Sequence, residues 1–167
     1  LAQLTQKYKE RKCKIYLLHG DLSSGQLTWL YQHEKIKTMI NIAHGEGFGL
    51  PMFEAAREAL PITTIGWSGQ MDFLAHDGED YFNDVDYSIR PVQKEAIWKG
   101  VIDPDQMWAH ADQGSYKMAL RKAHKDHDGL KQKAISLQEI NKDKFSDDSL
   151  YEIFVNSVME LFETSPI

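Results

Sequence analysis

The chain has 167 residues, of which 42% are apolar and 26% are charged, a composition typical of one globular domain. Its 19 Lys and Arg against 25 Asp and Glu give a net charge of −6, which argues against a nucleic-acid binder because such proteins present a basic face. No apolar run approaches the roughly 18 residues of a membrane span. The single cysteine, Cys13, excludes an internal disulfide and, with no secretory signal, predicts a cytoplasmic protein.

The first third of the chain alternates between helix and strand patterns. Residues 2–12 form a polar, helix-prone segment, and the apolar run Ile15-Tyr16-Leu17-Leu18 predicts a buried strand. Apolar residues at helical spacing over 25–34, preceded by Ser23 or Ser24 as a cap, predict a helix. Residues 39–43 form a second apolar run, which predicts another buried strand.

After this second strand, the chain passes through a glycine-rich loop into a predicted helix that Pro51 opens and Pro61 ends. Residues 62–65 predict a third strand. The helix carries a stripe of small or apolar residues for packing on a sheet, made of Met52, Ala55, Ala56 and Ala59. Continuously apolar strands indicate a parallel sheet covered on both faces, so the sequence predicts an α/β fold with a Rossmann-like sheet flanked by helices.

The rest of the chain divides into a loop-rich middle and a helical C-terminal third. The middle, 66–114, holds one predicted short buried strand near 87–89. Helices are predicted over 115–125, 129–141 and 149–163, the last with a capping box formed by Ser149 and Glu152. The last helix carries an apolar stripe made of Leu150, Ile153, Phe154, Val158, Leu161 and Phe162.

The segment that indicates chemistry is HGEGFGLPMFEAAREAL, residues 44–60. Its glycines let backbone N–H groups approach a ligand closely, and the helix N-terminus that follows favours anions. Glu46 lies on the loop, and Glu54 lies on the helix away from the small-residue stripe. Two carboxylates beside an anion cradle suit a ligand with hydroxyls on both sides of a diphosphate, which is the layout of a nucleotide sugar.

Each of these features also has an ordinary structural interpretation. The two glutamates are then surface carboxylates, and His44 is a loop histidine that bonds the backbone rather than a ligand. Three Asp-x-Asp patterns resemble metal-binding pairs, but in an acidic chain solvated turns explain them better, so no metal is expected. These patterns are Asp84/Asp86, Asp103/Asp105 and Asp126/Asp128.

The segment EGFGLPMFE resembles the E-x7-E motif of family 4 (group 1) GT-B glycosyltransferases. The similarity extends over about residues 15 to 150. It includes Leu18-His19-Gly20-Asp21-Leu22, Pro61-Ile62, Trp67-Ser68-Gly69, Trp108-Ala109, Asp112, Met118 and Arg121.

The resemblance implies a retaining, metal-independent transfer of sugar from a nucleotide-sugar donor, with no cofactor. It implies that Glu46 contacts the donor sugar and favours the transition state, and that Glu54 binds the ribose. It places the nucleobase beside Gly20 and Leu22. His44, from its place on the loop, is a further candidate contact to the donor. The sugar and the diphosphate would be held by backbone N–H groups of Gly47, Phe48, Gly49 and Leu50.

The chain departs from the family pattern in ways that set further expectations. Ala59-Leu60 stands where members carry glycine before proline, so this helix end is expected to be built differently. The Arg and Lys that clamp the diphosphate have no visible equivalent, and the N-terminal acceptor-binding domain is missing. We therefore expect residues 1–167 to be a single nucleotide-sugar-binding domain from a longer two-domain enzyme, located in the cytoplasm or peripherally at a membrane.

Without that other domain, the last helix is expected to expose its apolar stripe and to favour self-association. The alternative function is a non-catalytic module that binds a nucleotide sugar or a partner through a degenerate site. A dinucleotide-dependent oxidoreductase is disfavoured, because the third glycine and the later acidic residue of that fingerprint are not found at their expected offsets.

Overall fold

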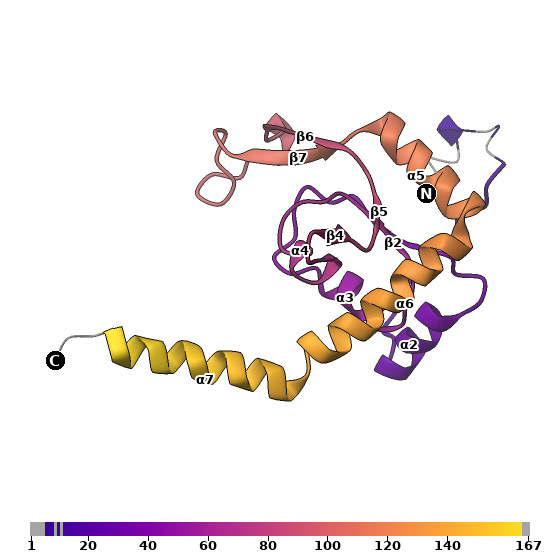
Figure 1. The fold of residues 1–167 in the computed structure, drawn as a ribbon. Coiled ribbons are helices and arrows are strands. Elements are labelled where there is room, and N and C mark those ends of the chain that lie inside the picture. The colour runs from indigo at the N-terminus through magenta and orange to yellow at the C-terminus, as the bar shows by residue number, and fades with distance from the viewer. Residues whose placement is uncertain (1–5, 9, 11, 165–167) are drawn as a thin grey trace.

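The computed structural model describes residues 6–8, 10 and 12–164. Within these residues the chain has a mixed α/β fold, with a small parallel sheet and six α-helices, the last ones forming the C-terminal part (Figure 1). The helix predicted over 2–12 lies partly outside the described residues, and of its described part only Gln6 and Lys7 are helical.

The sheet contains three parallel strands in the order β1 (Met39–Asn41), β2 (Ile62–Thr64) and β5 (Asn83–Asp84). Met39 pairs with Ile62 across β1 and β2, and Thr63 pairs with Asn83 across β2 and β5. Two of the predicted strands and their parallel arrangement are therefore confirmed, each strand one or two residues shorter than expected.

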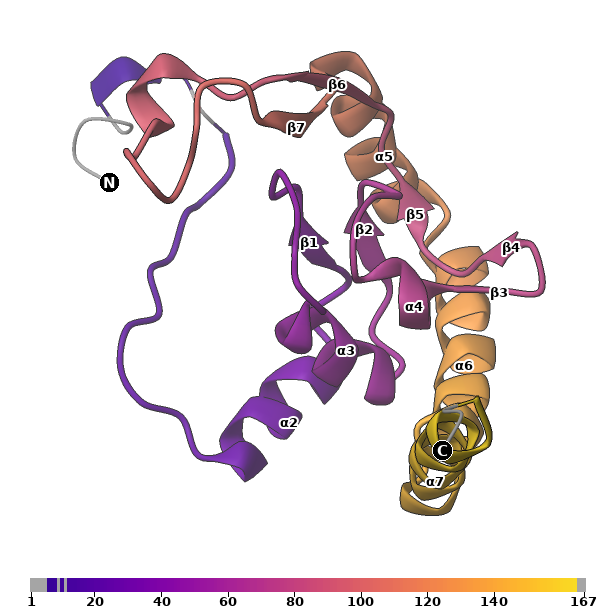
Figure 2. The ribbon, with the colours of Figure 1, turned by 90° about the vertical axis from the view of Figure 1, so that its left-hand side faces the viewer.

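The strand predicted at Ile15–Leu18 is wrong. This segment has no regular structure, and its four side chains are 47%, 83%, 72% and 67% exposed. Figure 2 shows it as an open arm that runs apart from β1 before the chain enters the helix at Ser24–Gln32. An apolar run reports only that a segment can be buried, whereas a strand also needs a neighbour that accepts its backbone hydrogen bonds.

Two helices frame the first strand of the sheet. Helix α2 (Ser24–Gln32) has a capping box: the Gln26 N–H donates to Ser23 Oγ at 3.4 Å, and the Ser23 N–H donates to Gln26 Oε1 at 2.9 Å. Helix α3 (Leu50–Arg57) begins one residue before Pro51. Both predicted helices and the Ser23 cap are confirmed.

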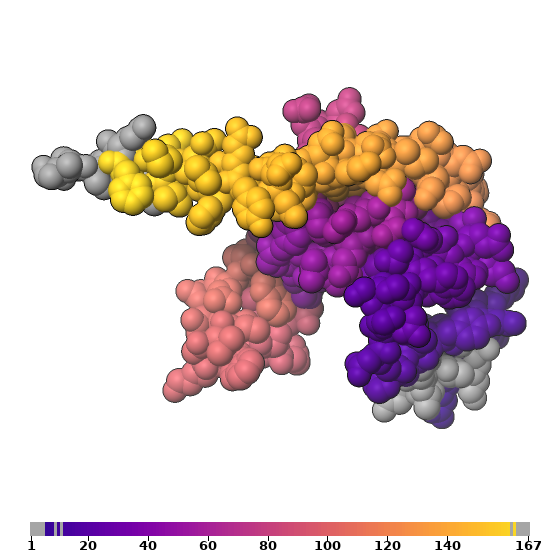
Figure 3. All heavy atoms as spheres, turned by 90° about the horizontal axis from the view of Figure 1, so that it is seen from below, coloured from indigo at the N-terminus to yellow at the C-terminus, as the bar shows by residue number. Residues whose placement is uncertain are grey.

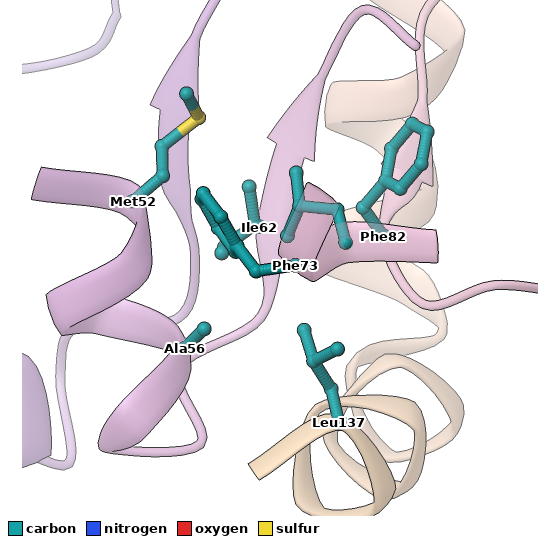
Figure 4. Packing of buried hydrophobic residues seen from close by; sticks show 7 residues of the cluster. Met52, Ala56, Ile62, Phe73, Phe82 and Leu137 are labelled. Carbon is teal, nitrogen blue, oxygen red and sulfur yellow. The ribbon is translucent and has the colours of Figure 1, made fainter. Parts of the chain in front are cut away.

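The main core lies between the sheet and the helices α3, α4 (Met71–Leu74) and α6 (His127–Lys144) (Figure 4). The predicted small-residue stripe of α3 is confirmed, because its residues are at most 5% exposed. The buried cluster consists of Met52, Ala56, Ile62, Phe73, Leu74, Phe82 and Leu137.

The end of α3 corrects the expectation drawn from Ala59. Ala59 takes the left-handed conformation itself, with φ 51°, so the geometry that glycine favours is kept without glycine. The Leu60 N–H donates to the Ala55 carbonyl at 3.0 Å, and Lys131 Nζ donates to the Ala59 carbonyl at 2.6 Å. The strained turn is thus held by a backbone bond and by a side chain from α6.

Two antiparallel hairpins occupy the middle of the chain, where the sequence predicts mostly loop. One joins β3 (Ala75–His76) to β4 (Glu79–Asp80), and the other joins β6 (Tyr87–Pro91) to β7 (Met107–Ala111). A strand near 87–89 is therefore present, but its predicted burial is wrong, since all of β6 is exposed. The β6–β7 hairpin is part of an arm that projects from the body, which explains the exposure (Figure 1).

The C-terminal part consists of α5 (Gln113–Lys125), α6 and α7 (Asp147–Thr164), as predicted. The predicted capping box at Ser149 is wrong, because α7 starts earlier and the Ser149 N–H donates to Ser146 Oγ at 3.2 Å. Figure 3 shows α7 reaching past the body. The large exposed apolar residues of α7 are Leu150, Tyr151, Ile153, Phe154, Val155, Met159 and Phe162.

No helix in the described part of the chain has the length and apolar character that crossing a membrane requires. The exposed face of α7 is consistent with the predicted self-association, which stays a prediction.

Candidate functional site: the glycine-rich loop between β1 and α3

The loop 44–49 leads from the carboxyl end of β1 into α3 without a side-chain cap. Gly49 is the N-cap residue and has φ 86°, a conformation that favours glycine. Its carbonyl accepts the N–H groups of Met52 and Phe53 at 2.8 and 3.0 Å. Among the described residues, no acceptor is found for the backbone N–H groups of Gly47, Phe48, Gly49 and Leu50. These donors are available to an anion at a helix N-terminus.

The loop is braced by Trp67-Ser68-Gly69. Ser68 Oγ donates to the Glu46 carbonyl at 2.7 Å and accepts the Glu46 N–H at 3.2 Å, while the Gly69 N–H reaches the same carbonyl at 3.1 Å. A Cβ on Gly69 would lie 1.8 Å from the carbonyl oxygen of Gly47, so only glycine fits there. The brace fixes the backbone on which Glu46 stands.

The carboxylate of Glu46 is held by a residue that sequence reasoning missed. Asn41 Nδ2, at the end of β1, donates to Glu46 Oε1 at 2.8 Å, and Asn41 Oδ1 accepts the Ala43 N–H at 2.8 Å. The second bond fixes which way the amide points. An amide residue inside the otherwise apolar run 39–43 was the signal available in the sequence.

Glu54 faces α2 across a cavity of about 260 Å³. Tyr31 and Glu54 both line this cavity, and Glu54 acts electrostatically on the Tyr31 hydroxyl. Burial raises the pKa of Tyr31, and the charge of Glu54 raises this pKa further. The described lining of the cavity does not include Glu46, so the two predicted carboxylates do not share this cavity. The lining consists of Ser24, Leu27, Thr28, Tyr31, Glu54, Arg57 and Glu58.

Phe48 points into the core, where its ring centroid lies 5.2 Å from that of Phe53 and 5.1 Å from that of Phe73. It therefore anchors the loop and offers only its backbone to a ligand. Leu50 is 58% exposed, and a Cβ on Gly47 would meet nothing within 4 Å, so the outer side of the loop is open.

His44 contacts the backbone, as expected for a loop histidine with a structural role. Its Nδ1 lies 2.6 Å from the Ala109 carbonyl oxygen, which can only accept, so Nδ1 carries the proton. Its ring stacks on Trp108 at 4.8 Å and lies 4.4 Å from the His110 ring. His44 thus ties the loop to β7. Burial lowers the pKa of His110, and His44 and Arg90 lower it further.

Gly20 and Leu22, the predicted contacts to a nucleobase, do not line the α2–α3 cavity. Both are exposed, and they belong to the arm that precedes α2, while the described lining of the α2–α3 cavity begins at Ser24. Their contact to a nucleobase stays a prediction.

The residues that the structure describes contain no group of three or more His, Cys, Asp or Glu side chains placed to hold a metal ion. Two of the three Asp-x-Asp patterns lie at the ends of regular elements. Asp126 is the N-cap of α6, and Asp84 is the last residue of β5.

Comparisons with protein-family models, with curated proteins and with solved structures give no match to this chain.

Proposed function

We propose that this chain is the donor-binding domain of a retaining glycosyltransferase, a Rossmann-like half of the GT-B type. The observation that carries the proposal is the set of unpartnered backbone N–H groups of 47–50, with Glu46 held beside them and Glu54 on the same helix. The donor is a nucleotide sugar, and the acceptor is bound by another domain.

The diphosphate of the donor lies at the start of α3. There the N–H groups of Gly49 and Leu50 and the positive end of the helix stabilise its charge without a basic side chain. Open space beside Gly47 leaves room for the sugar ring. The brace by Ser68 and Gly69 keeps these donors in place, so their orientation costs little when the donor binds.

Glu46 accepts hydrogen bonds from hydroxyl groups of the donor sugar. Asn41 occupies one of its carboxylate oxygens, which leaves the second oxygen for the sugar and for positive charge that develops at the anomeric carbon. Glu54 accepts the ribose hydroxyls in the α2–α3 cavity, where the Tyr31 hydroxyl already lies against it and Thr28 and Ser24 offer further hydroxyls.

In the transfer, the bond from the anomeric carbon to the phosphate oxygen breaks and a bond from that carbon to the acceptor oxygen forms. The proton of the acceptor hydroxyl passes to the leaving phosphate, so charge and atoms balance without a metal. The loop N–H groups stabilise the charge that grows on this phosphate.

The second candidate is a module that binds the nucleotide sugar, or a partner, without turnover. Two observations favour it: the loop 44–49 contains no Lys or Arg, and Glu46 does not line the cavity of Glu54. The two candidates differ in the full-length protein, where binding of a donor without transfer or hydrolysis would indicate the module.

Equilibrium binding of UDP, GDP and ADP and of their sugar conjugates tests the proposal, with Glu54→Gln as the variant and Glu152→Gln on exposed α7 as the matched control. We expect one nucleotide to bind selectively and its affinity to fall about tenfold in Glu54→Gln, the equivalent of one hydrogen bond to a charged group. Equal nucleotide affinities in the two variants would show that Glu54 does not contribute to nucleotide binding.

A further inference from the structure

We propose a second binding site, for a phosphate monoester, at the amino end of the parallel sheet. The glycine-rich loop follows β1, whereas Lys37 and Thr38 precede β1 and Leu60 and Pro61 precede β2. Parallel strands share their direction, so this site and the loop lie at opposite ends of the strands. The proposal is independent of the proposed donor site.

Two cavities occur at this end of the strands, with volumes of about 400 and 190 Å³. Lys37 and His127 line both of them. The larger cavity has an apolar wall from Leu120 and Ala123, and the smaller one is lined by Lys131 among others. Lys37 thus faces the apolar wall in the larger cavity and accompanies Lys131 in the smaller one, an arrangement that suits a phosphate group carrying a small organic body.

The described linings of the two cavities hold more basic than acidic side chains, whereas the whole chain has a net charge of −6. Asp126 and Asp128 adjoin His127 at the start of α6 but do not line the cavities. Lys131 is partly buried, and its Nζ bonds only the Ala59 carbonyl among the described residues. Burial lowers the pKa of Lys131, and the charge of Lys37 lowers it further, while no carboxylate acts on it in the opposite direction. Glu34 is the one acidic side chain in the described linings of the two cavities.

An unpartnered imidazole nitrogen supplies a second observation. Nδ1 of His127 is buried and has no hydrogen-bond partner among the described residues. His127 is also the first residue of α6, an 18-residue helix whose N-cap Asp126 makes no side-chain cap bond. Buried polar groups are normally paired, and His127 lines both cavities, so its unpartnered nitrogen indicates a missing partner. A phosphate accepts from lysine and histidine alike and would neutralise the repulsion between Lys37 and Lys131.

The test compares two exposed lysines two residues apart. Lys37 lines both cavities and Lys35 lines neither, so Lys37→Gln removes a ligand of the site and Lys35→Gln makes the same change of net charge outside it. Amide and histidine resonances are followed by NMR while inorganic phosphate or phenyl phosphate replaces chloride at constant ionic strength.

We expect saturable shifts around Lys37 and His127, tighter binding of phenyl phosphate than of inorganic phosphate, and affinity at least about tenfold lower in Lys37→Gln but unchanged in Lys35→Gln. Equal losses in the two variants, or shifts that do not saturate, would overturn the site. Equal affinity for the two probes would overturn the assignment to a monoester.

Discussion

Asn41 Nδ2 donates a 2.8 Å hydrogen bond to Glu46 Oε1, which links the last residue of β1 to the carboxylate on the loop that follows it. The Asn41 amide is itself fixed by the Ala43 N–H at 2.8 Å. The carboxylate of Glu46 is therefore aimed by the strand and not by its own flexible side chain, which is the arrangement expected of a preorganised binding group.

Replacing Asn41 by alanine is expected to reduce sugar recognition selectively. If Glu46 binds the sugar, Asn41→Ala lowers the affinity for the nucleotide sugar by about tenfold and leaves the affinity for the bare nucleotide unchanged. Titration calorimetry measures both, with Asn156→Ala on exposed α7 as the control. Equal losses for the nucleotide and its conjugate would show that Asn41 does not act through Glu46.

Replacing Gly69 by alanine is expected to displace the loop. The added Cβ would lie 1.8 Å from the carbonyl oxygen of Gly47, a backbone atom, so the brace must open at a cost of about 1–3 kcal/mol. Urea unfolding measures this loss. Gly25→Ala on α2 is the matched control, because its Cβ meets nothing within 4 Å, and it should leave stability unchanged or higher. Equal stability of both variants would contradict the brace.

Ala59 and Ala55 offer a paired test of the end of α3. Both are buried, but Ala59 has φ 51° whereas Ala55 lies inside the helix. Each change to glycine deletes one methyl group, and only Ala59→Gly relieves left-handed strain, while Ala55→Gly loses helix propensity. Ala59→Gly should therefore be the more stable variant by about 2 kcal/mol. Thermal melts that rank the two variants in the opposite order would contradict the strained turn.

Tyr31 should titrate above its ordinary pKa of 10.0, because burial and then Glu54 disfavour the phenolate. A raised pKa in the folded state stabilises the fold fully below pH 10, and this contribution is lost as the pH rises through the raised pKa. Comparing tyrosinate absorbance of the wild type and Tyr31→Phe isolates this phenol.

In Glu54→Gln, the pKa of Tyr31 should fall but stay above its ordinary value, since burial remains. A Tyr31 pKa that does not respond to this change would separate Tyr31 from Glu54 and weaken the assignment of their cavity.

The sequence predicted the elements whose signal is local. The apolar runs of β1 and β2, the Ser23 cap and the small-residue stripe of α3 each depend on a few neighbouring residues, and all are present. Ile15–Leu18 failed because strand formation depends on a partner that the run itself does not encode. The predicted burial of β6 failed for a different reason: β6 has a strand partner in β7, but the hairpin that they form projects from the body (Figure 1).

The sequence predicted the backbone of the candidate site but not the residues that hold it in place. Gly49 and Pro51 predicted that the loop ends where a helix begins, because glycine and proline have local conformational preferences that the sequence shows directly. Asn41 and Gly69 act on Glu46 and Gly47 through contacts between separate segments, which spacing alone does not reveal. Tyr31 reaches Glu54 only because α2 packs beside α3.

The most direct test of the donor site is an amide NMR titration of the chain with UDP, GDP and ADP. We expect one of them to shift the N–H resonances of Gly47, Gly49 and Leu50 together with those of residues around Glu54, because the diphosphate binds at the start of α3 and the ribose binds in the cavity between α2 and α3. Shifts that spare both regions with all three nucleotides would contradict it.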